Sequence, residues 1–143
     1  MAQFFTFYSF TEHLMEGVHD LDLDTLKAYL TDNTPDQAND AVKADLVESV
    51  AGGNGYTAGG HDITGVTSRT AQTTDLDATD VVITAAGGSI GPFRYVVIYN
   101  DTPVAPADPL IGYIDYGNSI NIGDGETFTL DFGTFLGQLT FTL

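Results

Sequence analysis

Hydrophobic and polar residues alternate with a period of two along much of the C-terminal half of the chain. Phenylalanine and leucine alternate with threonine and aspartate over residues 127–132, and the same kind of pattern returns over residues 139–143. Such alternation is typical of strands that bury one face. Residues 93–99 are apolar on both faces apart from Arg94, so this segment is expected to lie at the centre of a sheet.

Turn-forming residues separate these strands. The glycine-rich residues 52–60 predict a flexible loop, because glycine in a strand costs backbone entropy. Residues 100–109 hold Pro103, Pro106 and Pro109 and predict an extended surface loop, because proline cannot donate to a strand ladder. Further strands are predicted at residues 25–31, 61–72 (one strand or two pieces), 81–84, 110–116 and 120–122, with turns at 32–35, 87–88, 117–119 and 123–125.

Helical spacing is confined to the N-terminal third. Ser9 and Glu12 have the spacing of a capping box, which predicts a short helix that begins at Ser9 and ends at Gly17. Its apolar face would consist of Phe10, Leu14 and Met15. A weaker repeat of apolar residues at intervals of four predicts a second short helix within residues 36–50.

Short strands separated by Gly and Asp turns predict a mainly β fold, a sandwich or a jelly-roll-like barrel with one or two short helices in the N-terminal third. A chain of 143 residues fits a single β-rich domain over residues 1–143. Residues 4–8 are apolar and aromatic, and two interpretations stay open for them. They form either an edge strand of the core or part of an N-terminal arm, residues 1–8, that contacts a partner.

The charge is strongly negative, with 20 Asp and Glu against 4 Lys and Arg and a formal net charge of -16. Nucleic-acid binding needs cations to neutralise phosphates, so neither nucleic acid nor an anionic membrane is an expected partner. The charge serves either solubility or the recognition of a basic surface on a partner. With 0 cysteines there is no disulfide framework. The start lacks a signal-peptide pattern and no segment has the apolar length of a membrane span, so neither export nor insertion is expected.

One motif has the form of a catalytic sequence. Residues 87–91 match G-x-S-x-G, the nucleophile elbow, with Ser89 as the serine. The elbow requires a helix after the serine, whereas Pro92 and the alternation that follows predict a strand, so Ser89 is expected in a hairpin turn. His13, His19 and His61 would have to supply the base, and nothing in the sequence brings them to Ser89. No catalytic residue is assigned, and the chain is not expected to be an enzyme.

Metal and cofactor sites are weakly indicated. Residues 20–24 begin like a calcium loop, but Thr25 and Thr31 stand where that loop needs glycine and glutamate. Asp124 and Glu126 flank a glycine in an ordinary hairpin turn. The glycine loop lacks the lysine of a phosphate-binding motif, and His13 and His19 are separated by Gly17, which argues against a shared helical face. No cofactor or metal is assigned, and cation binding at the Asp-rich turns stays open.

Most of the chain resembles a group of small virion proteins of tailed bacteriophages, often encoded near the major capsid protein. The resemblance rests mainly on GGNGYTAGG at 52–60, GPFRYVVIYND at 91–101, LIGYIDYG at 110–117 and GETFTLDF at 125–132. Residues 10–14, 16–19 and 26–30 are similar as well. The resemblance implies a head decoration (cement) protein, made in the host bacterial cytoplasm and located on the outer capsid surface of the virion. Its partners would be the major capsid protein and copies of itself in a homotrimer.

Contact residues for this function are a separate hypothesis. The exposed aromatics of a terminal arm and the tip of a proline-rich loop are suitable anchors, so the predicted contacts are Phe4, Phe5, Phe7, Tyr8, Pro103 and Pro106. In the alternative interpretation, the loop at residues 100–109 makes no contact and is only an exposed tip. An alternative function is a head-fibre, tail-fibre or tail-tip module that binds the host surface, with glycans stacked on Tyr56, Tyr95, Tyr99, Tyr113 and Tyr116. An enzymatic alternative depends on Ser89 alone.

Overall fold

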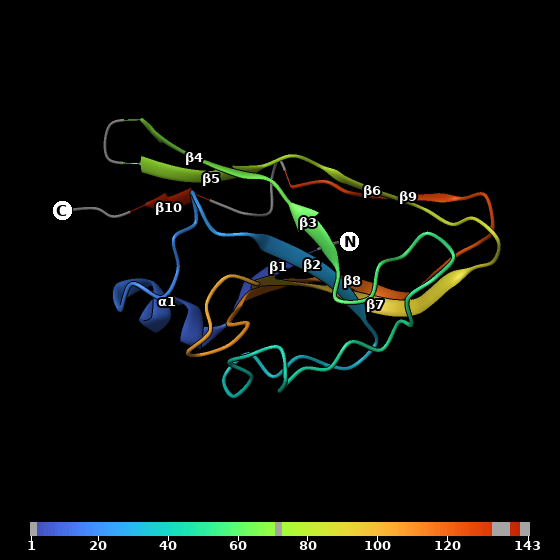
Figure 1. The fold of residues 1–143 in the computed structure, drawn as a ribbon, viewed down its shortest axis with the longest axis horizontal. Helices are drawn as coiled ribbons and strands as arrows, with labels where there is room; N and C mark the ends of the chain where they lie inside the picture. The colour runs from blue at the N-terminus through green and yellow to red at the C-terminus, as the bar shows by residue number, and fades with distance from the viewer. Residues whose placement is uncertain (1–2, 71–72, 133–137, 141–143) are drawn as a thin grey trace.

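The computed structural model describes residues 3–70, 73–132 and 138–140. Its largest element is a five-stranded antiparallel sheet in the order β1-β8-β7-β2-β3 (Figure 1). The strands are β1 (Gln3–Thr6), β2 (Leu26–Thr31), β3 (His61–Ile63), β7 (Ile90–Asn100) and β8 (Leu110–Ile122). The apolar segment 93–99 lies in β7, the middle strand, as predicted.

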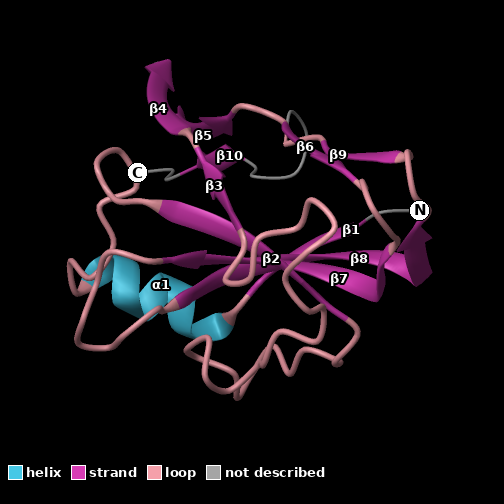
Figure 2. Cartoon of the chain, turned by 45° about the vertical axis from the view of Figure 1, so that its right-hand side comes forward, coloured by secondary structure: helices cyan, strands magenta, loops and turns pink. Residues whose placement is uncertain are grey.

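The remaining strands form a second layer over one face of this sheet (Figures 1 and 2). A three-stranded sheet has the order β10-β5-β4, and β6 pairs with β9. These strands are β4 (Gly65–Thr70), β5 (Thr73–Ala78), β6 (Val81–Thr84), β9 (Thr127–Leu130) and β10 (Gln138–Thr140). The fold is therefore mainly β and sandwich-like, and its described strands do not close into a barrel. The alternation predicted through residue 143 extends beyond the described residues.

The two layers enclose the larger core. Alternate side chains of the central strands point into it, as the period of two requires. β6 and β9 contribute Ile83 and Leu130 from the opposite layer, both nearly inaccessible to solvent. The central strands contribute Leu26, Ala28, Leu30, Phe93, Val96, Ile98, Ile111 and Ile114.

The other face of the main sheet carries a second core, rich in tyrosine. It contains Phe7, Tyr29, Leu46, Tyr95, Val97, Tyr99, Leu110 and Tyr113. Leu46 comes from the long connection between β2 and β3, which lies on this side of the sheet (Figure 1). Because both faces are covered, β2 and β7 are apolar almost throughout instead of alternating.

Helix α1 (Tyr8–Met15) is the one helix among the described residues. The predicted capping box is wrong: Phe7 occupies the N-cap position without a side-chain cap, and Ser9 Oγ is buried without a hydrogen-bond partner. The helix begins early because Phe7 is anchored in the second core. Met15 is exposed, which leaves Phe10 and Leu14 as the packed face.

The end of α1 is formed as predicted. Gly17 has φ 76°, and its N–H donates to the carbonyl of Leu14 (3.3 Å) while that of Val18 donates to His13 (2.9 Å). This is the Schellman pattern, which turns the chain back after the helix.

The second short helix predicted within residues 36–50 does not form. Asp36 Oδ1 accepts from the backbone of Ala38 and Asn39, and Asp45 Oδ2 accepts from Ala41 and Val42, all within 3.2 Å. Aspartate side chains that bind nearby backbone donors compete with helical hydrogen bonds. The apolar residues at intervals of four serve different contacts instead, since Leu46 and Val50 belong to different cores.

The turn predicted at residues 117–119 is a bulge inside one long strand. Tyr95 pairs with Asp115 but Phe93 pairs with Ile120, so β8 carries extra residues between these positions. Gly117 has φ 82°, and its N–H donates to Asp115 Oδ1 (2.8 Å). The turn residues therefore bend β8 without ending it.

Candidate interaction surface

Several connections meet at one end of the main sheet. The strand register places Thr6, Leu26, Asn100 and Leu110 at this end. Helix α1, the segment 17–25 and the loop 101–109 start or finish there and lie close together (Figures 1 and 2). The loop is tied to the segment, since Asp101 N donates to Thr25 O (2.9 Å) and Thr25 N donates to Thr102 Oγ1 (2.8 Å). We call these three connections the α1 end.

The α1 end displays apolar side chains to solvent. Tyr8 is 65% exposed, Met15 78%, Leu23 81% and Val104 88%. Val104 lies in a tight turn closed by its bridge to Ala107. Four of the six large hydrophobic residues that are exposed among the described part of the chain lie here. Such a grouping within polar surroundings marks an interaction site more often than a scattered set does.

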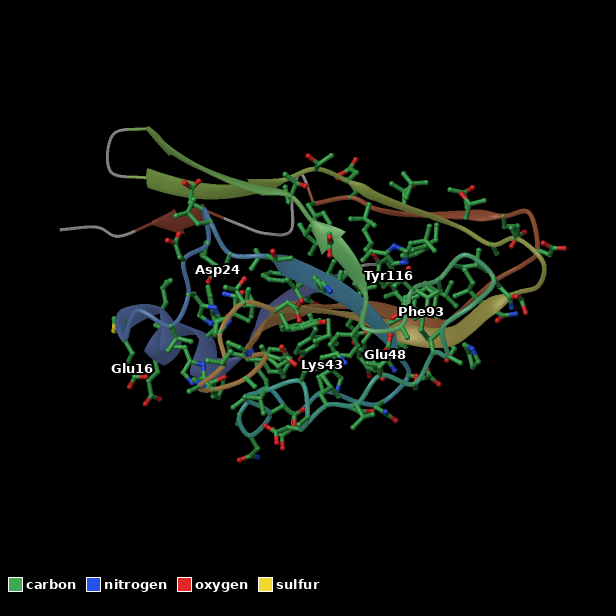
Figure 3. All side chains as sticks on the ribbon, in the orientation of Figure 1. Glu16, Asp24, Lys43, Glu48, Phe93 and Tyr116 are labelled. Atoms are coloured by element: carbon green, nitrogen blue, oxygen red, sulfur yellow. The ribbon has the colours of Figure 1, made fainter. Side chains whose placement is uncertain are left out.

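The surroundings of these side chains are anionic. Neither residues 3–25 nor residues 101–109 contain a lysine or arginine. Exposed carboxylates of the α1 end are Glu12, Glu16, Asp20, Asp22 and Asp101. Figure 3 shows Glu16 and Asp24 at this end of the molecule. Lys27, at the start of β2, approaches Asp101 Oδ2 (3.1 Å). The α1 end therefore suits a basic partner surface with apolar pockets.

The predicted N-terminal contacts lie mostly inside the fold. Phe5 stacks on Tyr113 with ring centroids 5.2 Å apart, Phe7 is fully buried, and Phe4 is half-buried. The edge-strand interpretation holds for residues 4–6, which lie in β1, whereas Phe7 is the N-cap of α1 and Tyr8 begins the helix. A free arm would require β1 to leave the sheet. Tyr8 exposes most of its side chain. Pro103 and Pro106 are half-buried at the tip that carries Val104.

The tyrosines considered for glycan stacking are packed instead. Tyr56, Tyr95, Tyr99 and Tyr113 are buried and Tyr116 is half-buried. Tyr99 donates to the carbonyl of Gly59 (2.6 Å) and Tyr56 donates to the Glu48 carboxylate. Burial also raises the pKa of Tyr116 to about 12. These rings stabilise the interior and do not present faces to a ligand.

Ser89 and the histidines are far apart along the main sheet. Ser89 directly precedes β7, whereas His19 bonds to Asn100 at the opposite end of that strand. His61 pairs with Ala28, which pairs with Ile98, so it also belongs to the far end of β7. The prediction that a strand follows Ser89 is confirmed, but the predicted hairpin does not form, since β6 pairs with β9 whereas β7 pairs with β2 and β8. No histidine is placed to activate this serine.

The Asp-rich turns use their carboxylates to hold the backbone. Asp20 Oδ1 accepts from Asp22 N and Leu23 N, both at 3.2 Å. In the turn between β8 and β9, which do not pair with each other, Asp124 Oδ1 accepts from Gly87 N (2.9 Å) and Glu126 Oε2 from Gly123 N (2.7 Å). Among the described residues no group of three or more His, Cys, Asp or Glu side chains is arranged to hold a metal ion.

A polar network that sequence reasoning missed lies beneath the α1 end. Asn100, fully buried, donates from Nδ2 to Asp24 Oδ2 (2.6 Å) and contacts His19 Nδ1 (3.1 Å). Burial is the main cause that lowers the pKa of His19 to about 4, with His13 adding to the shift and Asp24 opposing it. No short motif could have revealed this network, because Asn100 is about 80 positions away from its partners.

Comparison of the chain with protein-family models, with curated proteins and with solved structures finds no match. Within the described residues, no helix has the length and hydrophobicity needed to cross a membrane.

Proposed function

We propose that the chain is a non-enzymatic virion protein that decorates the outer surface of a tailed-phage capsid, with the α1 end as its contact with the major capsid protein. The observation that carries the proposal is the grouping of Tyr8, Met15, Leu23 and Val104 on an anionic surface. The phage assignment itself comes from the sequence resemblance. Apolar anchors supply most of the binding energy of an interface, and the carboxylates add charge selection for a basic capsid surface.

The scaffold suits a protein whose task is to bind. Cores on both faces of the main sheet hold the connections of the α1 end on a rigid support. A net charge of -16 is better tolerated outside the head than against packaged DNA. As a homotrimer, each subunit would need only a modest interface of about 800 Å² per partner, because three linked contacts bind with avidity.

Replacing Val104 with lysine is expected to reduce occupancy on capsids at least tenfold. The substitution exchanges the most exposed apolar side chain of the α1 end for a cation that repels a basic partner. A tenfold loss corresponds to about 1.4 kcal/mol, within the range of a single interface residue. Occupancy is measured by co-sedimentation of the purified chain with heads that lack it.

The matched control is Val82→Lys, the same change at an exposed valine of β6 in the other layer. This variant should bind like the wild type. Equal loss in both variants would point to net charge as the cause, and no loss in Val104→Lys would remove the α1 end as the contact. Binding of the wild-type chain to host cells in place of heads would favour the fibre alternative.

A further inference from the structure

His19 is enclosed between α1 and the end of the main sheet. Its side chain is only 6% exposed. The Phe10 ring meets it edge-on at 5.3 Å between centroids, and the His13 ring lies at 6.1 Å. Both of these neighbours belong to α1, so the helix packs directly on the His19 ring. The docking of α1 therefore depends on the state of this imidazole.

The hydrogen bonds of Asn100 determine which ring nitrogen of the neutral His19 carries the proton. Asn100 Oδ1 accepts from Thr102 N (3.1 Å) and Nδ2 donates to the Asp24 carboxylate (2.6 Å), which sets the orientation of the amide. The other Nδ2 hydrogen is then available to His19 Nδ1 (3.1 Å), which must accept it. The neutral ring consequently carries its proton on Nε2. A second proton, on Nδ1, would place two donors against each other.

The contact of α1 with His19 leaves polar atoms without partners. Among the described residues, three buried side-chain polar atoms have no hydrogen bond, and they are Ser9 Oγ, His13 Nδ1 and His19 Nε2. All three belong to α1 or to the ring that it covers. An unpaired buried polar atom costs free energy, so this docking is weaker than an apolar contact of the same area. A modest additional free-energy cost is therefore enough to undock α1.

The surroundings of His19 as a whole oppose its protonation. On α1 the titratable neighbour is His13, on the segment 17–25 it is Asp24, and the end of β7 contributes the uncharged Asn100. Asp24 favours a charged imidazole, but burial and His13 outweigh it. His19 gains a proton easily only when α1 moves away and water reaches the ring.

We propose that the His13–His19 contact is a pH-sensitive latch, in which protonation of His19 undocks α1 and the segment 17–25 from the main sheet. Acid would thereby dismantle the α1 end and weaken its binding to a partner, and only this consequence rests on the proposed function. The ordinary pKa of 6.5 applies to the undocked ring, and about 4 to the docked ring. The undocked state therefore binds more protons between these values, and docking is lost as the pH falls from about 6.5 towards 4. Between pH 7 and pH 5 the undocking equilibrium constant should rise about twentyfold.

Hydrogen exchange of the isolated wild-type chain tests the latch. Protection of the amides of Glu16, Gly17 and Val18, which close α1, is compared at pH 7 and pH 5 after correction for the intrinsic exchange rate. We expect protection to fall about twentyfold there while the amides of β7 keep theirs. His19→Phe should abolish this pH response, because its ring cannot be protonated. His61→Gln is the matched control and should retain it, although burial lowers the pKa of His61 as well.

The latch is overturned if α1 is equally protected at both pH values, if His19→Phe keeps the response, or if His61→Gln loses it. Should His19→Phe fail to fold, an NMR titration of the wild-type imidazoles decides, since titration of His19 near pH 6.5 with α1 still docked also overturns the latch. Capsid occupancy at pH 7 tests the proposed function separately. A chain that undocks in acid but does not bind heads at pH 7 keeps the latch and loses the function.

Discussion

Gly60→Ala is expected to lower the free energy of unfolding by about 4 kcal/mol. Gly60 has φ 98°, a conformation that residues with a side chain rarely adopt. A Cβ at this position would also lie 2.4 Å from the carbonyl oxygen of Ala28, and 2.7 Å from its carbon. Ala28 lies in the middle of β2, which is paired with both β3 and β7 at this position, so its carbonyl group cannot move aside. Unfolding in urea followed by circular dichroism measures the loss.

Gly59→Ala separates the two causes. Gly59 has nearly the same backbone strain, φ 89°, but the nearest atom to its added Cβ is the Tyr99 hydroxyl at 4.0 Å. Gly59→Ala should therefore lower the free energy of unfolding only by the conformational strain, about 1–2 kcal/mol. The difference between the two variants measures the contact of the glycine loop with β2. If the free energy of unfolding falls equally in both variants, the close approach of Gly60 to Ala28 does not exist in solution.

The sequence allows the loop at 52–60 to be predicted, but not this contact. Glycines show that the chain leaves regular structure, because they permit backbone conformations that other residues avoid. Which glycine touches another strand depends on tertiary packing. The central position of β7 was predictable for the opposite reason, since a short apolar run rich in β-branched and aromatic residues favours a strand that is covered on both faces of a sheet.

The failed predictions are local patterns that the tertiary structure overrides. Ser9 and Glu12 have capping-box spacing, yet burial of Phe7 fixes where α1 begins. In residues 36–50 the apolar spacing resembles a helix, but aspartate side chains bind the backbone first. Of the contact residues predicted from the sequence, Tyr8, Pro103 and Pro106 lie at the α1 end. The exposure of Leu23 and Val104 follows from how distant connections meet, which no local pattern records.

The histidine pair illustrates the same limit. Six positions and Gly17 separate His13 from His19, so a shared helical face was correctly rejected. Gly17 also ends the helix and turns the chain back, and His19 thereby comes to lie against the helix that it follows. Gly17 thus prevents a shared helical face but brings the His19 ring against His13. Asn100, which completes the cluster, comes from β7.

Asn100→Asp is expected to lower the free energy of unfolding by about 3–5 kcal/mol at pH 7, because it places an unpaired charge in the interior. The replacement has nearly the same shape as asparagine but exchanges the Nδ2 donor for a carboxylate oxygen. That oxygen would face Asp24 Oδ2, now 2.6 Å from Nδ2, at a fully buried position. It would also remove the donor to His19 Nδ1. Two carboxylates so close cannot both stay charged.

The loss should depend on pH in a defined direction. Sharing the site raises the pKa of one carboxyl in the folded variant, so the folded state takes up a proton that the unfolded state releases. The penalty is therefore largest at neutral pH and shrinks as the pH falls through that raised value. Urea unfolding of variant and wild type at pH 7 and pH 5 measures the difference at each pH.

Asn118→Asp, the same charge change at an exposed position of β8, should cost less than about 0.5 kcal/mol at both values. A penalty at Asn100 that is independent of pH would instead indicate simple loss of hydrogen bonds, and would contradict the close approach of Asn100 to Asp24.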